Sequence, residues 1–257
     1  MKIRSFQFTF IFLMICTISV IGPSTVFADA HETEGERTSP EAEAEGMSPE
    51  AEAMEEKPPI TGWFQVDVDS LGTYFLVGAN HPIGGLSIAS NIYINDINKG
   101  KYTGEFDLGV TVPVVANDSM SLLLQPMVGI GFDYTSLDNP DALYPQIFAF
   151  LNAGDIFFFH WTISTFSTIF HEDSTNELYN RSYLTYSLNE TIAIGPQVES
   201  VFVYADELDK PLLLNLGVRL NIGYGKANTL GLYFGYETKK GEDETGLTGR
   251  MNFTRFW

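Results

Sequence analysis

The sequence has almost no cysteine and few histidines. Its single cysteine, Cys16, lies near the N-terminus in a segment that we expect to be removed. Without cysteine, the rest of the chain forms no disulfide, uses no thiol as a nucleophile and offers no thiolate to a metal. Three of the four histidines, His31, His81 and His171, fall in a tail or in connections, so no three-histidine metal site is indicated. We therefore expect neither a metal nor a cofactor.

Basic residues are also scarce. The chain has 14 lysines and arginines against 33 aspartates and glutamates, which gives a formal net charge of −19. Nucleic-acid binding needs a basic face, so this balance argues against a nucleic-acid partner. It argues equally against attachment to anionic lipid head groups through charge alone.

Long hydrophobic runs are confined to the N-terminus. Lys2 and Arg4 precede a mostly apolar stretch over residues 6–20, and Ala28-Asp29-Ala30 has the small-x-small form of a cleavage site. This pattern predicts a secretory signal peptide over residues 1–30, with an uncleaved membrane anchor as the alternative. Later in the chain no run of eighteen apolar residues occurs, so no transmembrane helix is predicted.

Residues 31–60 are acidic and of low complexity. A nine-residue unit that begins Ser-Pro-Glu-Ala-Glu-Ala occurs twice in tandem, from Ser39 and from Ser48. Such a composition cannot bury enough apolar surface to offset the entropy lost on ordering. We predict a disordered periplasmic tail that acts as a solvated linker, with loose cation binding or docking on a basic partner as alternative roles. Pro58-Pro59 closes the tail, and one folded domain is expected over residues 61–257.

The folded part alternates apolar and polar residues. Between Tyr102 and Val114 the large apolar residues share one parity, while Glu105 and Asp107 fall on the other. A period of two is typical of a β-strand with one apolar and one polar face. Turn residues divide this part of the chain into about twelve such segments: 62–69, 73–79, 86–95, 102–115, 119–134, 143–151, 156–169, 178–187, 191–204, 212–224, 229–238 and 246–257.

The connections between these segments alternate between short and long. Residues 225–228 make a short connection, whereas residues 239–245 make a long, charged one. Outer-membrane barrels have short periplasmic turns and longer outside loops. The sequence therefore predicts an all-β fold: a closed antiparallel up-and-down transmembrane β-barrel of about twelve strands, with ten as the alternative. An even strand number would place both termini in the periplasm. A soluble all-β periplasmic protein with an apolar interior is a further alternative, because periodicity does not say which face points inward.

The last strand carries an additional pattern. Leu247, Met251, Phe253 and Trp257 share one parity, and the chain ends on Trp257. This pattern resembles the assembly signal of bacterial outer-membrane β-barrel proteins, although Arg255 occupies a position that is usually apolar or aromatic. The resemblance covers residues 247–257 and identifies no family of known activity. It implies insertion by the barrel-assembly machinery into the outer membrane, with outer-membrane lipids around the barrel.

Aromatic residues gather at the predicted strand ends. Amphipathic rings favour the level of the lipid head groups, which produces two aromatic girdles around a membrane barrel. Aromatics are also good strand residues in general, but their segregation to the ends favours girdles. The predicted members are Tyr102, Tyr134, Tyr204 and Tyr236 at the outer rim, and Tyr186, Tyr224 and Trp257 at the inner rim.

The inward positions carry mixed charges. Many of their neighbours are glycines, and small residues that face inward would leave room for water. We therefore predict a narrow passive channel for small hydrophilic solutes, with a weak cation preference because rings of carboxylates attract cations. The oligomeric state stays open. The lumen-facing candidates are Glu105, Asp107, Asp133, His160, Arg181, Glu199, Arg219, Glu237 and Arg250.

Two other functions compete with a channel. The charges would close the lumen if they paired across it, which would give a structural or partner-binding barrel. His160 shares a face with Thr162, and a histidine beside a hydroxyl can activate a nucleophile, so a lumen-facing hydrolase is a weaker alternative. No Gly-x-Ser-x-Gly elbow occurs, and we do not expect an enzyme. Residues 156–161 are apolar on both faces apart from His160, which indicates an oligomer contact or a locally filled lumen.

Overall fold

The computed structural model describes residues 61–69, 72–83, 86–95, 103–133, 140–204, 212–239 and 246–257. The predicted signal peptide and acidic tail lie outside the described residues, as do Tyr102 and Tyr134. The strands are β1 (Thr61–Asp69), β2 (Thr73–Ile83), β3 (Leu86–Asn95), β4 (Thr103–Asn117), β5 (Met120–Asp133), β6 (Pro140–Ala153), β7 (Ile156–Thr165), β8 (Glu177–Ser187), β9 (Ile192–Val203), β10 (Leu213–Tyr224), β11 (Asn228–Lys239) and β12 (Gly246–Phe256).

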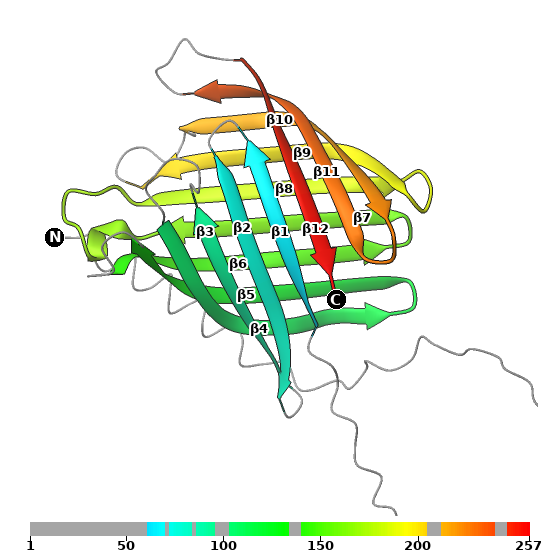
Figure 1. Cartoon of the computed structure of the whole chain (residues 1–257), viewed down its shortest axis with the longest axis horizontal. Coiled ribbons are helices and arrows are strands. Elements are labelled where there is room, and N and C mark those ends of the chain that lie inside the picture. The colour runs from blue at the N-terminus through cyan, green and yellow to red at the C-terminus, as the bar shows by residue number, and fades with distance from the viewer. Residues whose placement is uncertain are drawn as a thin grey trace, which may run out of the picture.

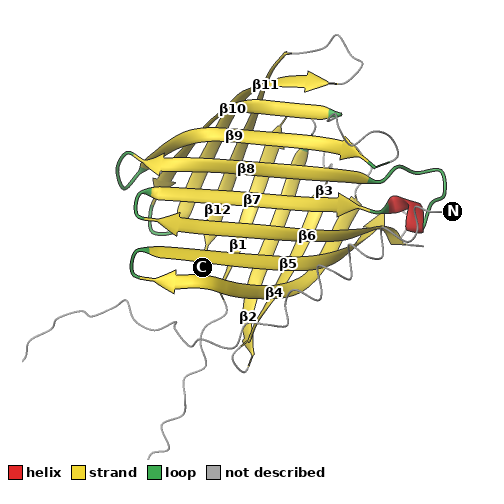
Figure 2. Ribbon diagram, turned by 180° about the vertical axis from the view of Figure 1, so that it is seen from behind, coloured by secondary structure: helices red, strands yellow, loops and turns green. Residues whose placement is uncertain are grey.

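These strands form a closed barrel in which each strand pairs antiparallel with its neighbours in the chain. β1 and β12 complete the ring, with Phe64 opposite Arg255 and Val68 opposite Met251. Figure 1 shows β12, β1 and β2 running steeply across a broad curved layer that contains β4 to β10, and Figure 2 shows the same layer from behind. The predicted closed antiparallel barrel of twelve strands is confirmed, and the alternative of ten strands is wrong.

The short turns at one end of the barrel are built from local side-chain contacts. Asn117 accepts hydrogen bonds at Oδ1 from the backbone N–H groups of Ser119, at 3.1 Å, and Met120, at 2.9 Å. Asn189 does the same for Thr191 and Ile192, both at 2.9 Å. An asparagine that bonds to the backbone two residues later fixes a tight turn, which is why the polar interruptions in the sequence become hairpins.

The described long connection lies at the opposite end. It joins β7 to β8 and contains a short 3-10 helix, η2 (Ser167–Ile169). Asn176 holds this connection together, because its side chain bonds to the backbone N–H of Thr168 at 3.0 Å and to the hydroxyl of Thr168 at 2.8 Å. Within the described part of the chain, no helix is both long and apolar enough to cross a membrane.

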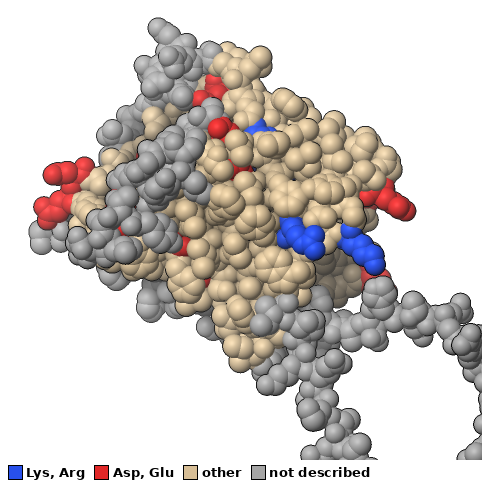
Figure 3. All heavy atoms as spheres, in the orientation of Figure 1, with Lys and Arg blue, Asp and Glu red and all other residues tan. Residues whose placement is uncertain are grey.

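Polarity is inverted relative to a soluble protein. Charged residues such as Asp107, Glu199 and Arg219 are at most 3% exposed, whereas Leu108, Leu216 and other large aliphatic residues are more than half exposed. Figure 3 shows a broad band without charged residues across the visible face, with most charged atoms toward its two ends. Apolar side chains on the outside and polar side chains inside are the arrangement of a barrel that sits in lipid. The chain is a transmembrane β-barrel of the outer-membrane type, and the soluble alternative is excluded.

The inward glycines do not leave room for water as the sequence suggested. A side chain at Gly231 would collide with Arg219 and Asn252, and one at Gly235 would collide with Tyr233. A Cβ at Gly131 would meet the ring of Tyr144. Large side chains therefore lie flat over the glycines, and this packing fills part of the lumen.

Candidate functional site: the barrel interior

The interior holds two cavities at opposite ends of the barrel. The inner cavity, of about 600 Å³, lies at the short-turn end and reaches Asn152, Asn189 and Trp257. The outer cavity, of about 420 Å³, lies toward the long connections and reaches Thr165 and Glu237. Four residues line both cavities and mark the level where the two meet: Tyr74, Tyr93, Trp161 and Arg181.

Ion pairs join opposite walls of the lumen at this level. Arg181 on β8 bonds through Nη1 to Asp67 Oδ2 on β1 at 3.1 Å. β8 and β1 are five steps apart by the shorter path around the twelve-stranded ring, so this contact crosses the bore. Arg181 Nε also lies 3.3 Å from Glu199 Oε1 on β9. The cluster therefore occupies the lumen between the two cavities.

Arg250 on β12 completes the cluster. Its guanidinium lies 3.3 Å from Asp67 Oδ2, 2.7 Å from Asp69 Oδ2 and 3.0 Å from Glu199 Oε2. The side chains of the cluster are at most 10% exposed, so water screens these charges poorly. We call Asp67, Asp69, Arg181, Glu199 and Arg250 the mid-lumen ion-pair layer.

Aromatic rings support this layer from one side. The Arg181 guanidinium carbon lies 5.6 Å from the ring centroids of both Trp161 and Tyr179. Arg181 Nε also donates to Tyr179 Oη at 2.8 Å, and Tyr179 Oη donates to Glu199 at 3.1 Å. Cation–π contacts and hydrogen bonds together fix the guanidinium plane, so the layer has a defined geometry.

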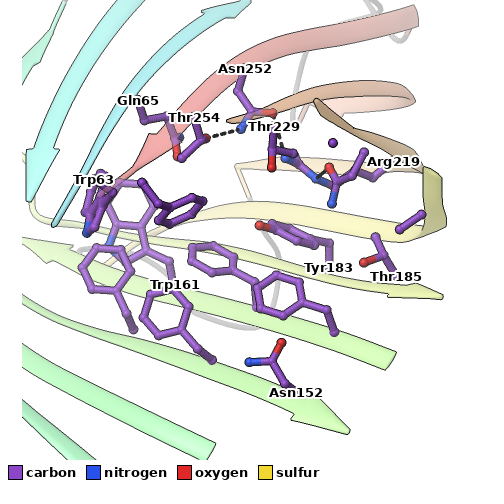
Figure 4. A pocket seen from close by; sticks show the side chains of 18 of the residues that line it. Trp63, Gln65, Asn152, Trp161, Tyr183, Thr185, Arg219, Thr229, Asn252 and Thr254 are labelled. Carbon is purple, nitrogen blue, oxygen red and sulfur yellow. Dashed lines mark hydrogen bonds between the residues drawn. The ribbon is translucent and has the colours of Figure 1, made fainter. Parts of the chain in front are cut away.

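The inner cavity has two chemically different walls (Figure 4). One wall, from β6, β7 and β8, is aromatic; its members are Phe148, Phe150, Phe157, Phe159, Trp161 and Tyr183. The other wall, from β1, β10 and β12, is polar and includes Gln65, Arg219 and Asn252. Arg219 donates to Asn252 Oδ1 at 2.7 Å and to Gln197 Oε1 at 3.2 Å. Its guanidinium carbon lies 4.2 Å from the centroid of the Tyr183 ring.

A second acidic group lies on the opposite side of the lumen. Glu105 and Asp107 on β4 are 4% and 1% exposed. Gln146 on β6 donates to Glu105 at 3.3 Å and accepts from the indole N–H of Trp161 at 2.8 Å. This chain of contacts connects the β4 carboxylates to the aromatic wall. Among the described residues no group of three or more potential metal ligands comes together.

The structure brings most of the predicted lumen residues into the interior. Arg181, Glu199 and Arg250 belong to the mid-lumen ion-pair layer, and Arg219 lies in the polar wall of the inner cavity. The outer cavity is lined by Glu105 and Glu237, and Asp107 is buried beside Glu105. Asp133 is the last residue of β5, at the outer rim.

The prediction that His160 lines the lumen is wrong. Trp161, its neighbour in β7, is 6% exposed and lines both cavities, so His160 points to the opposite, lipid-facing side. Its ring bonds to Ser182 on β8 at 2.7 Å and to Thr162 at 2.7 Å. The alternation rule fails here because the first part of β7 is apolar on both faces. The polar His160 alone then indicated which residues point inward, and it indicated the wrong set. A lumen-facing hydrolase built on His160 is therefore excluded.

The described girdle residues lie at strand ends. Tyr186, Tyr224, Tyr236 and Trp257 are 45–53% exposed. Tyr204 lies at the outer end of β9, where its hydroxyl is 3.0 Å from Ser164 and its ring stacks on Phe166.

Asp67 was not identified from the sequence as a lumen residue, and the sequence left open whether the aromatic run over residues 156–161 faces the lumen. Asp67 lies between Val66 and Val68, so the same parity rule would have found it as an inward residue. The inward Phe157, Phe159 and Trp161 correspond to the locally filled lumen that residues 156–161 indicated. No local signal says that Asp67 meets Arg181, because that contact depends on barrel closure.

No protein-family model matches the sequence, and no curated protein matches it. Several solved structures do match. A KdgM porin in complex with disordered oligogalacturonate is 12% identical, with a TM-score of 0.48 over 76% of this chain and 98% of that chain. The NanC porin is 12% identical, with a TM-score of 0.45 over 77% of this chain and 100% of that chain. OccAB3 of Acinetobacter baumannii is 10% identical, with a TM-score of 0.43 over 72% of this chain and 55% of that chain. These distant likenesses concern the barrel fold alone.

Proposed function

We propose that this barrel is a narrow passive channel of the outer membrane for small hydrophilic solutes, and that the mid-lumen ion-pair layer limits passage through it. The observation that carries the proposal is the pair of cavities, about 600 and 420 Å³, that share the level of Arg181. The outer cavity and one wall of the inner cavity are lined by polar side chains, inside an apolar cylinder. Such a path replaces part of the hydration of a small polar solute, which the surrounding lipid cannot do.

We also propose a weak cation preference. The outer cavity is lined by five carboxylates against two guanidinium groups: Asp69, Glu105, Glu177, Glu199 and Glu237 against Arg181 and Arg250. An entrance with an excess of carboxylates raises the local concentration of cations and lowers that of anions. The inner cavity is balanced, with Asp67 and Glu190 against Arg181 and Arg219. The preference should therefore arise at the outer entrance and be modest.

A closed structural or partner-binding barrel is the second candidate. The specific observation in its favour is that Arg181 and Asp67 meet across the bore at 3.1 Å. Buried charges that pair with several partners are costly to separate, so such a layer resists opening. Under this alternative the two cavities are separate pockets, and no solute crosses the barrel.

Channel activity separates the two candidates. The full-length folded protein is reconstituted into planar bilayers, with protein-free bilayers and boiled protein as controls. A channel gives discrete conductance steps, smaller than those of sixteen-stranded porins because a twelve-stranded bore is narrower. The reversal potential in a salt gradient should indicate a modest preference for cations. Bilayers that stay silent at all voltages would reject the channel and leave the closed barrel.

We further propose that the short-turn end, where the described chain both begins and ends, faces the periplasm. Gly62 and Trp257 lie side by side at this end and exchange two backbone hydrogen bonds of 3.1 Å. The resemblance of the last strand to an assembly signal supports insertion by the barrel-assembly machinery. Export through the signal peptide and a periplasmic tail belong to the same proposal.

A further inference from the structure

The lipid-facing surface of β7, β8 and β9 carries a connected group of polar side chains. His160 bonds to Ser182 and to Thr162, each at 2.7 Å, and Thr162 donates to Asn180 Oδ1 at 2.8 Å. Asn180 Nδ2 lies 3.4 Å from Ser200 Oγ. We call His160, Thr162, Asn180, Ser182 and Ser200 the outward polar patch, of which Ser200 is only 9% exposed.

The patch contrasts with other outward positions of the barrel. β4 presents Phe106, Leu108, Val110 and Val112 to the lipid, and β10 presents Leu214, Leu216, Val218, Leu220 and Ile222. Another outward polar pair, His81 with Ser90 at 2.9 Å, lies close to the short turn between β2 and β3, at the rim. The patch instead lies in the middle of its strands, since His160 is the fifth residue of β7 and Ser182 the sixth of β8.

Polar groups at this depth are unfavourable in contact with acyl chains. Hydrocarbon offers no hydrogen-bond partner, and each unsatisfied donor or acceptor costs free energy. The internal bonds of the patch satisfy only part of its capacity, because a carboxamide has two donors and each hydroxyl accepts as well as donates. A protein surface with matching groups covers such a patch better than lipid does.

A second copy of this chain supplies matching groups. His160 uses both ring nitrogens within the patch, whereas the carboxamide and the hydroxyls keep further hydrogen-bonding capacity. With neutral histidine the patch carries no charge that would repel its own copy. A two-fold contact places the same patch on both partners, so it needs this self-complementarity. Ala149, which pairs with His160, is small and lets the second copy approach the patch closely.

Exposed apolar residues follow the patch-bearing strand β7 in the chain. Ile169 and Phe170 follow β7 in the long connection at the outer end, and they are 55% and 38% exposed. We propose that the outward polar patch is the contact surface on which a second copy of this chain docks to form a dimer in the membrane. The patch lies outside the lumen, so this proposal does not depend on channel activity.

Cysteine cross-linking in the intact outer membrane tests the proposal. The only native cysteine, Cys16, lies in the expected signal peptide, so single cysteines can be introduced without further changes. Ser182→Cys should form a disulfide-linked dimer at least about tenfold faster than Leu108→Cys, an outward position on β4, because the contact brings two copies of Ser182 together. Equal rates for the two variants would overturn the proposal.

A second measurement uses apolar replacements within the patch. The double variant His160→Leu and Asn180→Leu should keep a folded barrel, because leucine suits the lipid face. Its dimer should dissociate roughly tenfold more readily for each interfacial hydrogen bond lost. Analytical ultracentrifugation in mild detergent compares it with wild type and with Leu108→Ala as a control. A wild-type protein that sediments as a monomer, or a double variant that dimerises as strongly, would contradict the proposal.

Discussion

At the residue scale, contacts converge on Asp67. Its Oδ2 lies 3.1 Å from Arg181 and 3.3 Å from Arg250, and its side chain is 8% exposed. The two arginines come from β8 and β12, so one carboxylate ties opposite walls of the lumen together. Removing this charge breaks both contacts and leaves Arg181 with Glu199 alone and Arg250 with Asp69 and Glu199, so the buried cluster is less well compensated.

We expect Asp67→Asn to weaken the barrel and widen the path. The amide keeps the shape of the side chain but loses the charge that holds Arg181 and Arg250. The free energy of unfolding should fall by about 3 kcal/mol, measured by urea unfolding in lipid vesicles, and single-channel conductance should rise. Thr229→Val, which changes the lining of the inner cavity away from the ion pairs, is the control. Unchanged conductance in Asp67→Asn would mean that the layer does not limit passage.

Ion preference depends on the lumen arginines. The combined change Arg219→Ala and Arg250→Ala removes two cations from the interior and leaves the carboxylates in place, so cation preference should rise. The reversal potential in a salt gradient measures this change. Arg255→Ala is a matched control, because Arg255 faces outward at the rim, where it bonds to Asn228. A reversal potential equal to that of wild type would remove Arg219 and Arg250 from the conduction path.

At the element scale, the closing seam between β1 and β12 distinguishes a barrel from an open sheet. Phe256 pairs with Trp63 along this seam, and Gly62 exchanges backbone hydrogen bonds with Trp257. A side chain on Gly62 would collide with the indole of Trp257 and with the backbone of Gly78. The last aromatic residue therefore packs on the first strand and covers its end.

We expect Gly62→Val to impair closure, because its side chain displaces the Trp257 indole. Trp257→Ala should have a similar effect by removing the ring. The fraction of folded barrel is measured by gel mobility with and without boiling, and it should fall severalfold in both variants. Tyr186→Ala, an exposed rim aromatic away from the seam, serves as the control. Full assembly of both seam variants would show that the seam does not need this contact.

The strands were largely predictable from the sequence, whereas their contacts across the lumen were not. Alternation along residues 212–224 gave both the strand and its inward Arg219, since polar and apolar residues there differ sharply. β7 lacked that contrast, and His160 was assigned to the wrong face. The pairing of Asp67 with Arg181 joins residues 114 positions apart in the chain, so it depends on closure and not on local sequence. The outward polar patch could not be predicted from the sequence for the same reason, because it includes His160, whose outward direction is visible only in the structure.

At the scale of the whole molecule, the two faces of the barrel differ in polarity, with polar side chains inward and apolar side chains outward. Buried residues of the described chain include Asp67, Glu199 and Arg219, while Leu216 and Phe234 are 55% and 67% exposed. This inverted distribution fits lipid outside and polar groups inside. Both the proposed channel and the proposed dimer contact follow from it.

Cysteine labelling in native membranes tests this direction most directly. Thr229→Cys faces the inner cavity and Leu216→Cys faces the lipid. We expect a small, charged, water-soluble thiol reagent to modify Thr229→Cys, whereas Leu216→Cys should react with this reagent only after denaturation. In a separate measurement, a fluorophore attached to Leu216→Cys should be quenched by lipid-borne quenchers. Rapid aqueous labelling of Leu216→Cys together with protection of Thr229→Cys would contradict this arrangement of the two faces.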